Sequence, residues 1–274
     1  MEEKPPYLFE AGLNPAGAPL TITTDVDGAI IDIAVRGNWH GPLAAAVSLA
    51  VHKCLAESPA AIVVDATEVN DETSASVPTW FSASQAAAAA DPPARLALCL
   101  AAESALAGKL RHLGADRYVP VFDSPAEART ALGGRRPLTE VVRLRLPPSP
   151  VSPSVARNLV GGACEAWNLT PLLHPGRAVL SELVSNAVEH AGTEMEVSIS
   201  RRGTALHLAV RDRSASFPRI IALAAAQPGR PLDERGYGLR VVHADSIAWG
   251  AIPSEGGKMV WATVRDRAGQ RRRW

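Results

Sequence analysis

The sequence predicts a chain of two α/β domains. Strand-like and helix-like segments alternate through the first half of the chain, which is typical of an open α/β sandwich. A second series of helices and strands follows a glycine-, arginine- and proline-rich linker over 133–137. At 274 residues, the chain is long enough for two hydrophobic cores. We expect an N-terminal extension over 1–16, an α/β domain over 17–133, a linker and first strand over 134–153, a second α/β domain over 154–265 and a basic tail over 266–274.

The N-terminal domain is expected to open with two strands joined by a hairpin turn at Asp27-Gly28. Strand-like and helix-like patterns then alternate along the chain. The expected strands are 21–24, 29–36, 60–65, 95–101 and 118–122, and the expected helices are 43–55, 77–90 and 103–113. A last helix begins at Ser124-Pro125-Ala126-Glu127, where a serine cap, a proline in the first turn and a glutamate form a capping box.

The C-terminal domain is expected to follow a stiff proline-rich turn over 147–153, which precedes its first helix. Later elements are read from apolar periodicity and from turn residues. The expected elements are a helix over 180–191, strands over 195–200 and 205–211 joined by a turn at 201–204, a helix starting at Leu239, and strands over 247–251 and 259–264. Pro253 and Gly256-Gly257 are expected to separate the last two strands.

The helix expected over 180–191 has two faces. Its apolar residues follow the i, i+3, i+4 spacing of a core-facing stripe: Leu180, Leu183, Val184, Ala187, Val188 and Ala191. Glu182, Asn186 and Glu189 form one polar row on the other side. Asn186 can offer a carbonyl oxygen to Mg²⁺, and Glu182 can orient a water or take a proton. The alternative interpretation is a solvated helix face.

Two further motifs contain candidate ligand-binding residues. Asp212 follows the strand over 205–211, so its carboxylate stands where a strand opens into a loop. Gly236-Tyr237-Gly238-Leu239 precedes an apolar helix, and glycines in that position let backbone amides approach a phosphate. A simple turn is the alternative for this glycine pair.

The order of these three motifs resembles the Bergerat-type ATP-binding fold of gyrase, histidine kinases and the MutL proteins, the GHKL superfamily. Within it, the compact form is similar to the anti-sigma-factor serine/threonine kinases of bacterial partner switching. The resemblance implies that Asn186 ligates Mg²⁺ and that Glu182 activates the attacking hydroxyl or positions it. It implies that Asp212 binds the adenine amino group, and that Gly236, Gly238 and Leu239 belong to the loop around the phosphates of ATP.

The segment over 214–235 would then be a lid over the nucleotide, and its arginines are Arg219, Arg230 and Arg235. Arg235, beside the glycine pair, is our first choice for stabilising phosphoryl charge, with a solvated loop arginine as the alternative. Two departures from the family pattern bear on nucleotide affinity rather than on the fold. No glycine follows Asp212 closely, and Arg240 stands where a glycine often follows the leucine.

The N-terminal domain resembles the STAS domain of anti-sigma-factor antagonists. The resemblance rests on residues 62–69, on Ser74-Ala75-Ser76 at the opening of a helix, and on residues 121–128. It implies that a serine in this turn accepts phosphate from a partner kinase. Ala75 occupies the usual position and has no hydroxyl, which leaves Ser74 or Ser76. The alternative is that both hydroxyls cap the helix.

Composition narrows the functional classes. The chain has 28 lysine and arginine residues and 28 aspartate and glutamate residues. Its net charge therefore gives no overall electrostatic attraction to nucleic acid or to a membrane surface. Three scattered cysteines, with no signal-peptide pattern and no membrane-length apolar run, fit a cytoplasmic protein.

Two hypotheses follow. The first is an ATP- and Mg²⁺-dependent serine/threonine kinase whose partners are a STAS-domain antagonist, in cis or in trans, and a sigma factor. The second is a non-catalytic module that acts only through protein–protein contacts, with a degenerate or purely structural nucleotide site. The kinases that the sequence resembles are commonly dimers, so a homodimer is a further expectation. Glu182 discriminates the two hypotheses, because a pure binding module has no need of a base there.

Overall fold

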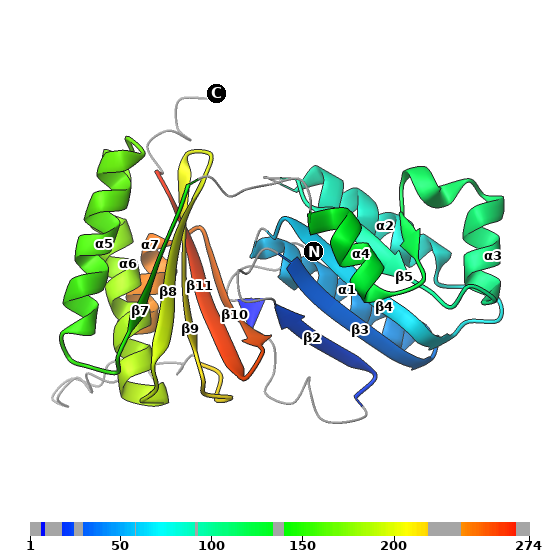
Figure 1. Ribbon diagram of the computed structural model, residues 1–274, viewed down its shortest axis with the longest axis horizontal. Helices are drawn as coiled ribbons and strands as arrows, with labels where there is room; N and C mark the ends of the chain where they lie inside the picture. The colour runs from blue at the N-terminus through cyan, green and yellow to red at the C-terminus, as the bar shows by residue number, and fades with distance from the viewer. Residues whose placement is uncertain are drawn as a thin grey trace, which may run out of the picture. The chain divides into compact units, whose positions relative to one another are not determined.

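The computed structural model describes residues 7–8, 18–24, 30–57, 59–90, 93–133, 140–218 and 237–266. The chain divides into two compact units, both built of helices and strands (Figure 1). The N-terminal unit comprises Phe9–Pro137 and Ile252–Glu255, and the C-terminal unit comprises Met1–Leu8, Leu138–Ala251 and Gly256–Trp274. The predicted α/β class is confirmed. The Asp27-Gly28 turn, most of the linker over 133–137 and residues 267–274 of the basic tail lie outside the described residues.

The N-terminal unit contains a sheet in the order β6-β5-β4-β3-β2, in which β2 is antiparallel to β3 and the other pairs are parallel. Its strands are β2 (Leu20–Thr24), β3 (Ile30–Asn38), β4 (Ala61–Asn70), β5 (Arg95–Cys99) and β6 (Val121–Phe122). Its helices are α1 (Gly41–Ala56), α2 (Val77–Ala89), α3 (Ala105–His112), the short η1 (Ala115–Arg117) and α4 (Pro125–Gly133). The alternation predicted from the sequence is therefore present.

Two details of the N-terminal unit refine the predictions. β4 runs to Asn70, beyond the expected end at 65, because its pairing with β3 resumes after a bulge and ends in a hydrogen bond of 3.1 Å between Asn70 and Asn38. The start of α4 follows the predicted cap. Ser124 Oγ accepts from the Glu127 amide at 3.3 Å, and Glu127 Oε2 accepts from the Asp123 amide at 3.3 Å.

The C-terminal unit contains a sheet in the order β10-β11-β9-β8-β7, with β1 parallel to β10. Its strands are β1 (Tyr7–Leu8), β7 (Val141–Leu146), β8 (Met195–Arg202), β9 (Ala205–Asp212), β10 (Ala248–Ser254) and β11 (Gly257–Arg265). Its helices are α5 (Ser152–Ala166), the short η2 (Thr170–Leu172), α6 (Leu173–Asn186), the π-helical turn η3 (Ala187–Ala191) and α7 (Tyr237–Asp245). Helices α5 and α6 lie along one face of this sheet (Figure 1).

Two expectations for the C-terminal unit need correction. The helix expected over 180–191 is α-helical only to Asn186 and continues as a π-helical turn. Pro253 and Gly257 do not lie between the last two strands, because β10 extends to Ser254 and β11 begins at Gly257. The turn between the two strands contains Gly256, with φ +73°. Within the expected N-terminal extension, Tyr7 pairs with Gly250 on the sheet.

The core of the C-terminal unit positions the candidate site. Leu180, Leu183 and Val184 of α6 are buried against alternate residues of two neighbouring strands. On β9 these are Leu206, Leu208 and Val210, and on β11 they are Val260, Ala262 and Val264. Because side chains alternate across a strand, Asp212 and Lys258 continue the same two rows. The helix-covered face therefore ends in a pair of charged side chains.

Candidate functional site

Gly238, the second glycine of the predicted Gly236–Leu239 motif, lies directly against the polar row of α6. An ideal Cβ built on Gly238, in the first turn of α7, would lie 2.5 Å from Glu182 Oε2 and 3.6 Å from Asn186 Oδ1. The backbone of α7 can approach the two side chains this closely only because residue 238 has no side chain. Three residues predicted from two separate motifs are thus brought together.

Glu182 is a half-buried carboxylate with perturbed acidity. Burial raises the pKa of Glu182 above its ordinary value. The negative charge of Glu189, further along the same polar row, raises this pKa too. A carboxylate with a raised pKa is a better proton acceptor near neutral pH than an ordinary one. The position of Glu182 beside Gly238, together with this shift, suits a general base.

Asn186 has a buried polar atom whose hydrogen-bonding capacity is not used within the described part of the chain. Its Nδ2 is inaccessible to solvent and has no hydrogen-bond partner there. An unsatisfied buried amide costs about 1–3 kcal/mol, so such a group in a native fold requires an explanation. Asn186 is also the last residue of α6 before the π-helical turn, a deviation that is frequent at functional sites.

The side chains around Gly238 fit a nucleotide-bound magnesium ion. Within the described residues there is no cluster of three or more His, Cys, Asp and Glu side chains that could hold a metal by itself. Magnesium is usually held by one or two protein oxygens together with substrate phosphates and waters. Asn186 Oδ1 is an oxygen of the required type, and it lies close to Gly238.

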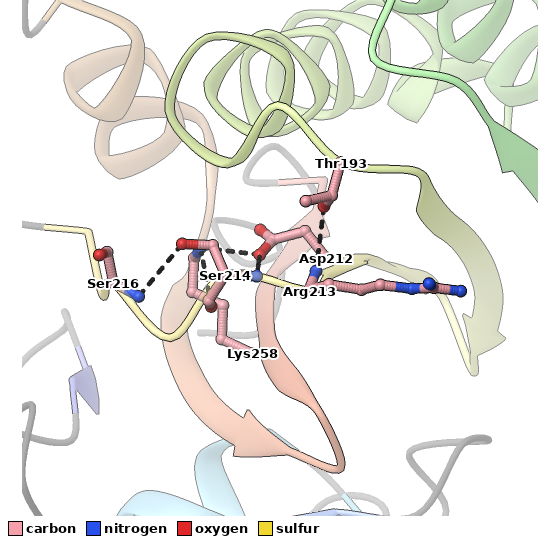
Figure 2. A network of polar contacts seen from close by, with 6 residues as sticks. All are labelled: Thr193, Asp212, Arg213, Ser214, Ser216 and Lys258. Atoms are coloured by element: carbon pink, nitrogen blue, oxygen red, sulfur yellow. Dashed lines mark hydrogen bonds and ion pairs between the residues drawn. The ribbon is translucent and has the colours of Figure 1, made fainter.

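Asp212 stands at the end of β9 and is buried, in the network that Figure 2 shows. Its Oδ1 accepts a hydrogen bond of 2.8 Å from the Ser214 amide and one of 2.9 Å from Lys258 Nζ. The exit from the strand is fixed by a bond of 3.1 Å from the Arg213 amide to Thr193 Oγ1, and by one of 3.2 Å from the Ser216 amide to Ser214 Oγ. The predicted carboxylate is therefore rigidly oriented.

Lys258 is a site residue that the sequence reasoning missed. It lies directly opposite Asp212 in the antiparallel register of β11 and β9. The close approach depends on Gly257, where an ideal Cβ would lie 1.9 Å from the backbone oxygen of Asp212. A lysine at an inward-facing position of a strand, directly after a glycine, is the signal that could have indicated it.

Of the remaining predicted residues in the nucleotide site, Leu239 is half-buried and packs against the core of the C-terminal unit. Arg235 and Gly236 lie outside the described residues, as do Arg219 and Arg230 of the expected lid.

The candidate phosphoacceptors lie in the N-terminal unit. Ser74 is half-buried, with φ +56°, in the turn before α2. Ser76 is buried, and its Oγ accepts a hydrogen bond of 2.8 Å from Trp80 Nε1, so Ser74 is the more accessible of the two hydroxyls. The capping alternative needs correction for Ser76, because Asp71 instead accepts from the amides of Ala75 and Ser76, at 2.8 and 2.9 Å.

Glu182, Asn186 and Gly238 all lie within one continuous region of the C-terminal unit that resembles known proteins. Residues 154–264 match the family model described as the histidine kinase-like ATPase domain. This part of the chain is a domain of that family, as the order of its motifs predicted. No curated protein matches the sequence.

Two solved structures are among those similar to the chain. An anti-sigma factor antagonist from Mycobacterium paratuberculosis is 18% identical with a TM-score of 0.36, and the match covers 42% of this chain and 94% of that chain. The RsbU and RsbW domains of a Mycobacterium tuberculosis protein are 17% identical with a TM-score of 0.34, over 46% of this chain and 32% of that chain. The family model therefore carries the assignment, and it covers the C-terminal domain.

No helix within the described ranges is both long enough and apolar enough to span a membrane.

Proposed function

We propose that the protein is an ATP-dependent serine/threonine kinase of the anti-sigma type. The observation that carries this proposal is the convergence of Glu182, Asn186 and Gly238 inside a region that matches a histidine kinase-like ATPase domain. The buried Asn186 Nδ2, which has no hydrogen-bond partner within the described residues, and the close approach of Gly238 to Glu182 support this proposal over a solvated helix face.

Each residue has a defined task in the proposed reaction. Asn186 would hold Mg²⁺ through its side-chain oxygen, and the ion, when bound, would supply neutralisation of phosphate charge. Glu182 accepts the proton of the attacking serine hydroxyl at its carboxylate. The serine oxygen then bonds to the γ-phosphorus of ATP, the bond to the β–γ bridging oxygen breaks, and ADP leaves. Gly238 keeps the backbone close enough to surround the phosphates.

The proposed protein substrate is a serine on a STAS domain. The N-terminal unit of the same chain is one candidate, and we assign its acceptor hydroxyl to Ser74 because Ser76 is buried and bonded to Trp80. A STAS-domain antagonist on another chain is the alternative acceptor. The second partner that we propose is a sigma factor, which would be held or released according to which partner is phosphorylated.

A non-catalytic binding module is the second candidate function. The observation that favours it is the ion pair of 2.9 Å between Lys258 Nζ and Asp212 Oδ1, at the residue expected to bind adenine. In addition, Arg213 and Ser214 follow Asp212 where the family has glycines. Under this candidate, the C-terminal unit keeps the fold of an ATPase and acts by protein contact alone.

Phosphoryl transfer by the full chain separates the two candidates. The purified protein is incubated with Mg²⁺ and γ-labelled ATP, and label in the chain and released phosphate are both measured. We expect Glu182→Gln to bind ATP normally and to lose transfer by about 100-fold or more, the usual contribution of a positioned base. Asn186→Ala should weaken Mg·ATP binding, whereas the neighbouring Ser185→Ala should not. Equal transfer by the wild type and by Glu182→Gln would remove Glu182 from the mechanism.

A further inference from the structure

The ion pair between Asp212 and Lys258 is almost completely buried. The side chain of Lys258 is 7% exposed and that of Asp212 is 2% exposed. Both stand at the end of rows that are otherwise apolar, Val210 on β9 and Val260 on β11 being the next residues on the same face. Because removing two charges from water is expensive, a buried pair of this kind stabilises a fold no better than two apolar residues. Its presence at the end of the core points to a role in binding.

The pair retains hydrogen-bonding capacity on both partners. Both bonds that Asp212 accepts from described residues, from the Ser214 amide and from Lys258, end on Oδ1. The lysine ammonium has three N–H donors. Two of them are accounted for by Asp212 Oδ1 at 2.9 Å and by the Ser214 carbonyl oxygen at 3.4 Å. Among the described residues, Asp212 Oδ2 and the third N–H of Lys258 are therefore left as an acceptor and a donor on the two partners of one ion pair.

We propose that Lys258 reads the base of the bound nucleotide together with Asp212. This inference rests on the proposed function, which places a nucleotide in the C-terminal unit. The exocyclic amino group of adenine donates to Asp212 Oδ2, and Lys258 donates its third N–H to the adjacent ring nitrogen N1. Lys258 is then a specificity-determining residue for adenine, and the backbone approach at Gly257 is what places it there.

The order of donor and acceptor gives this pair its selectivity. Adenine presents an amino donor next to the N1 acceptor. Guanine in the same placement presents the O6 oxygen to the Asp212 carboxylate and the N1–H group to the Lys258 ammonium. Both contacts are then repulsive, and unpaired buried polar groups are what a site uses to reject a wrong ligand. Adenine nucleotides should therefore bind more tightly than guanine nucleotides.

A nucleotide analogue tests the contact without changing the protein. In 1-deaza-ATP a C–H group replaces N1, so the acceptor for Lys258 is lost while the amino group remains. Titration calorimetry of the full chain with Mg²⁺ should show that 1-deaza-ATP binds about 10- to 100-fold more weakly than ATP, as expected for a hydrogen bond to a charged group. GTP should bind more weakly than ATP as well.

The same two nucleotides, measured on a variant of Lys258, show whether the loss of affinity depends on that lysine. Lys258→Met should bind ATP more weakly than the wild type and should bind 1-deaza-ATP and ATP to within about 2-fold. Since this variant leaves a buried carboxylate unpaired, circular dichroism establishes that it is folded. If the variant does not fold, the comparison of the two nucleotides on the wild type decides alone.

Three results would contradict the proposal. Equal affinity of the wild type for ATP and 1-deaza-ATP would show that Lys258 does not contact N1, while nucleotide binding itself would stand. Tighter ATP binding by Lys258→Met would show that the lysine obstructs the base and does not read it. Binding of neither nucleotide by the wild type would overturn the proposed function and this inference together.

Discussion

The α-carbon of Gly238 faces the Glu182 carboxylate so closely that a methyl group on residue 238 would lie 2.5 Å from Glu182 Oε2. The candidate base Glu182 and Gly238 therefore lie next to each other, although they come from different motifs. Because the atom in the way is the end of a flexible side chain, a methyl group there would displace the carboxylate rather than disrupt the backbone.

Gly238→Ala should consequently separate function from stability. We expect phosphoryl transfer to fall at least about 10-fold, since a small misplacement of a catalytic group has a large effect on rate, with little change in the free energy of unfolding. The matched control is Gly162→Ala in α5, where an added Cβ would contact nothing within 4 Å. That exchange should stabilise the helix by about 0.5–1 kcal/mol and leave transfer unchanged. Unchanged transfer in Gly238→Ala would contradict the site.

The pH dependence of transfer should report the pKa of Glu182. A base acts only when it is deprotonated, so the rate should rise as pH increases through this pKa, which burial and then Glu189 raise above the ordinary value. In Glu189→Gln one of the two causes is removed, and the rising limb should move to lower pH. The shift should shrink at high salt because Glu189 is exposed. A limb that stays in place or moves to higher pH would exclude Glu182 as the titrating base.

His207 on β9 should make stability pH-dependent. Burial lowers the pKa of His207 well below its ordinary value, and the nearby charge of Arg202 acts in the same direction. In the unfolded chain the imidazole takes up a proton below about pH 6.5, which the folded state resists. The contribution of His207 to the free energy of unfolding should therefore be constant above that pH and fall as pH drops below it, by at most about 1.4 kcal/mol per pH unit.

Urea unfolding at pH values on both sides of this point measures the effect. His207→Gln, which can keep a hydrogen bond to Thr263, should flatten the dependence. His112→Gln removes an exposed histidine of α3 and should behave as the wild type does. Identical pH slopes for the wild type and His207→Gln would show that His207 does not contribute.

Phosphorylation of the N-terminal unit, if the substrate is in cis, should fall on Ser74. Mass spectrometry of peptides after incubation with Mg·ATP should find phosphate on Ser74 and none on Ser76, whose hydroxyl is buried against Trp80. Ser74→Ala should abolish the modification. Ser76→Ala is the matched control and should still be phosphorylated. Phosphate on Ser76 would contradict the assignment of the acceptor, and an unmodified peptide would leave a substrate in trans.

Much of the fold follows from local patterns in the sequence. The apolar pattern of β9 predicts the strand and places Asp212 at its end. The apolar stripe of α6 predicts that the polar row lies on the opposite side of the helix. These features are local, because side-chain periodicity is set by the backbone of one element. The same patterns indicate Glu182, Asn186, Asp212 and the Gly236–Leu239 motif as candidate site residues without any information on contacts between them.

The missed features depend on contacts between distant segments. Lys258 meets Asp212 only through the register of β11 with β9, and register depends on the whole sheet. The pairing of Tyr7 with Gly250 involves two residues, too few for a periodic pattern. Asp71 caps α2 from five residues before Ser76, farther than the usual capping position.

Binding of Mg·ATP to the full chain, measured by titration calorimetry with Asp212→Asn as the control, tests the central claim most directly. The account predicts saturable binding that requires Mg²⁺ and is lost in Asp212→Asn, a variant whose fold is checked by circular dichroism. No binding up to about 5 mM ATP, above the usual range of enzyme KM values, would contradict it. Equal binding by Asp212→Asn would contradict the assignment of the base site.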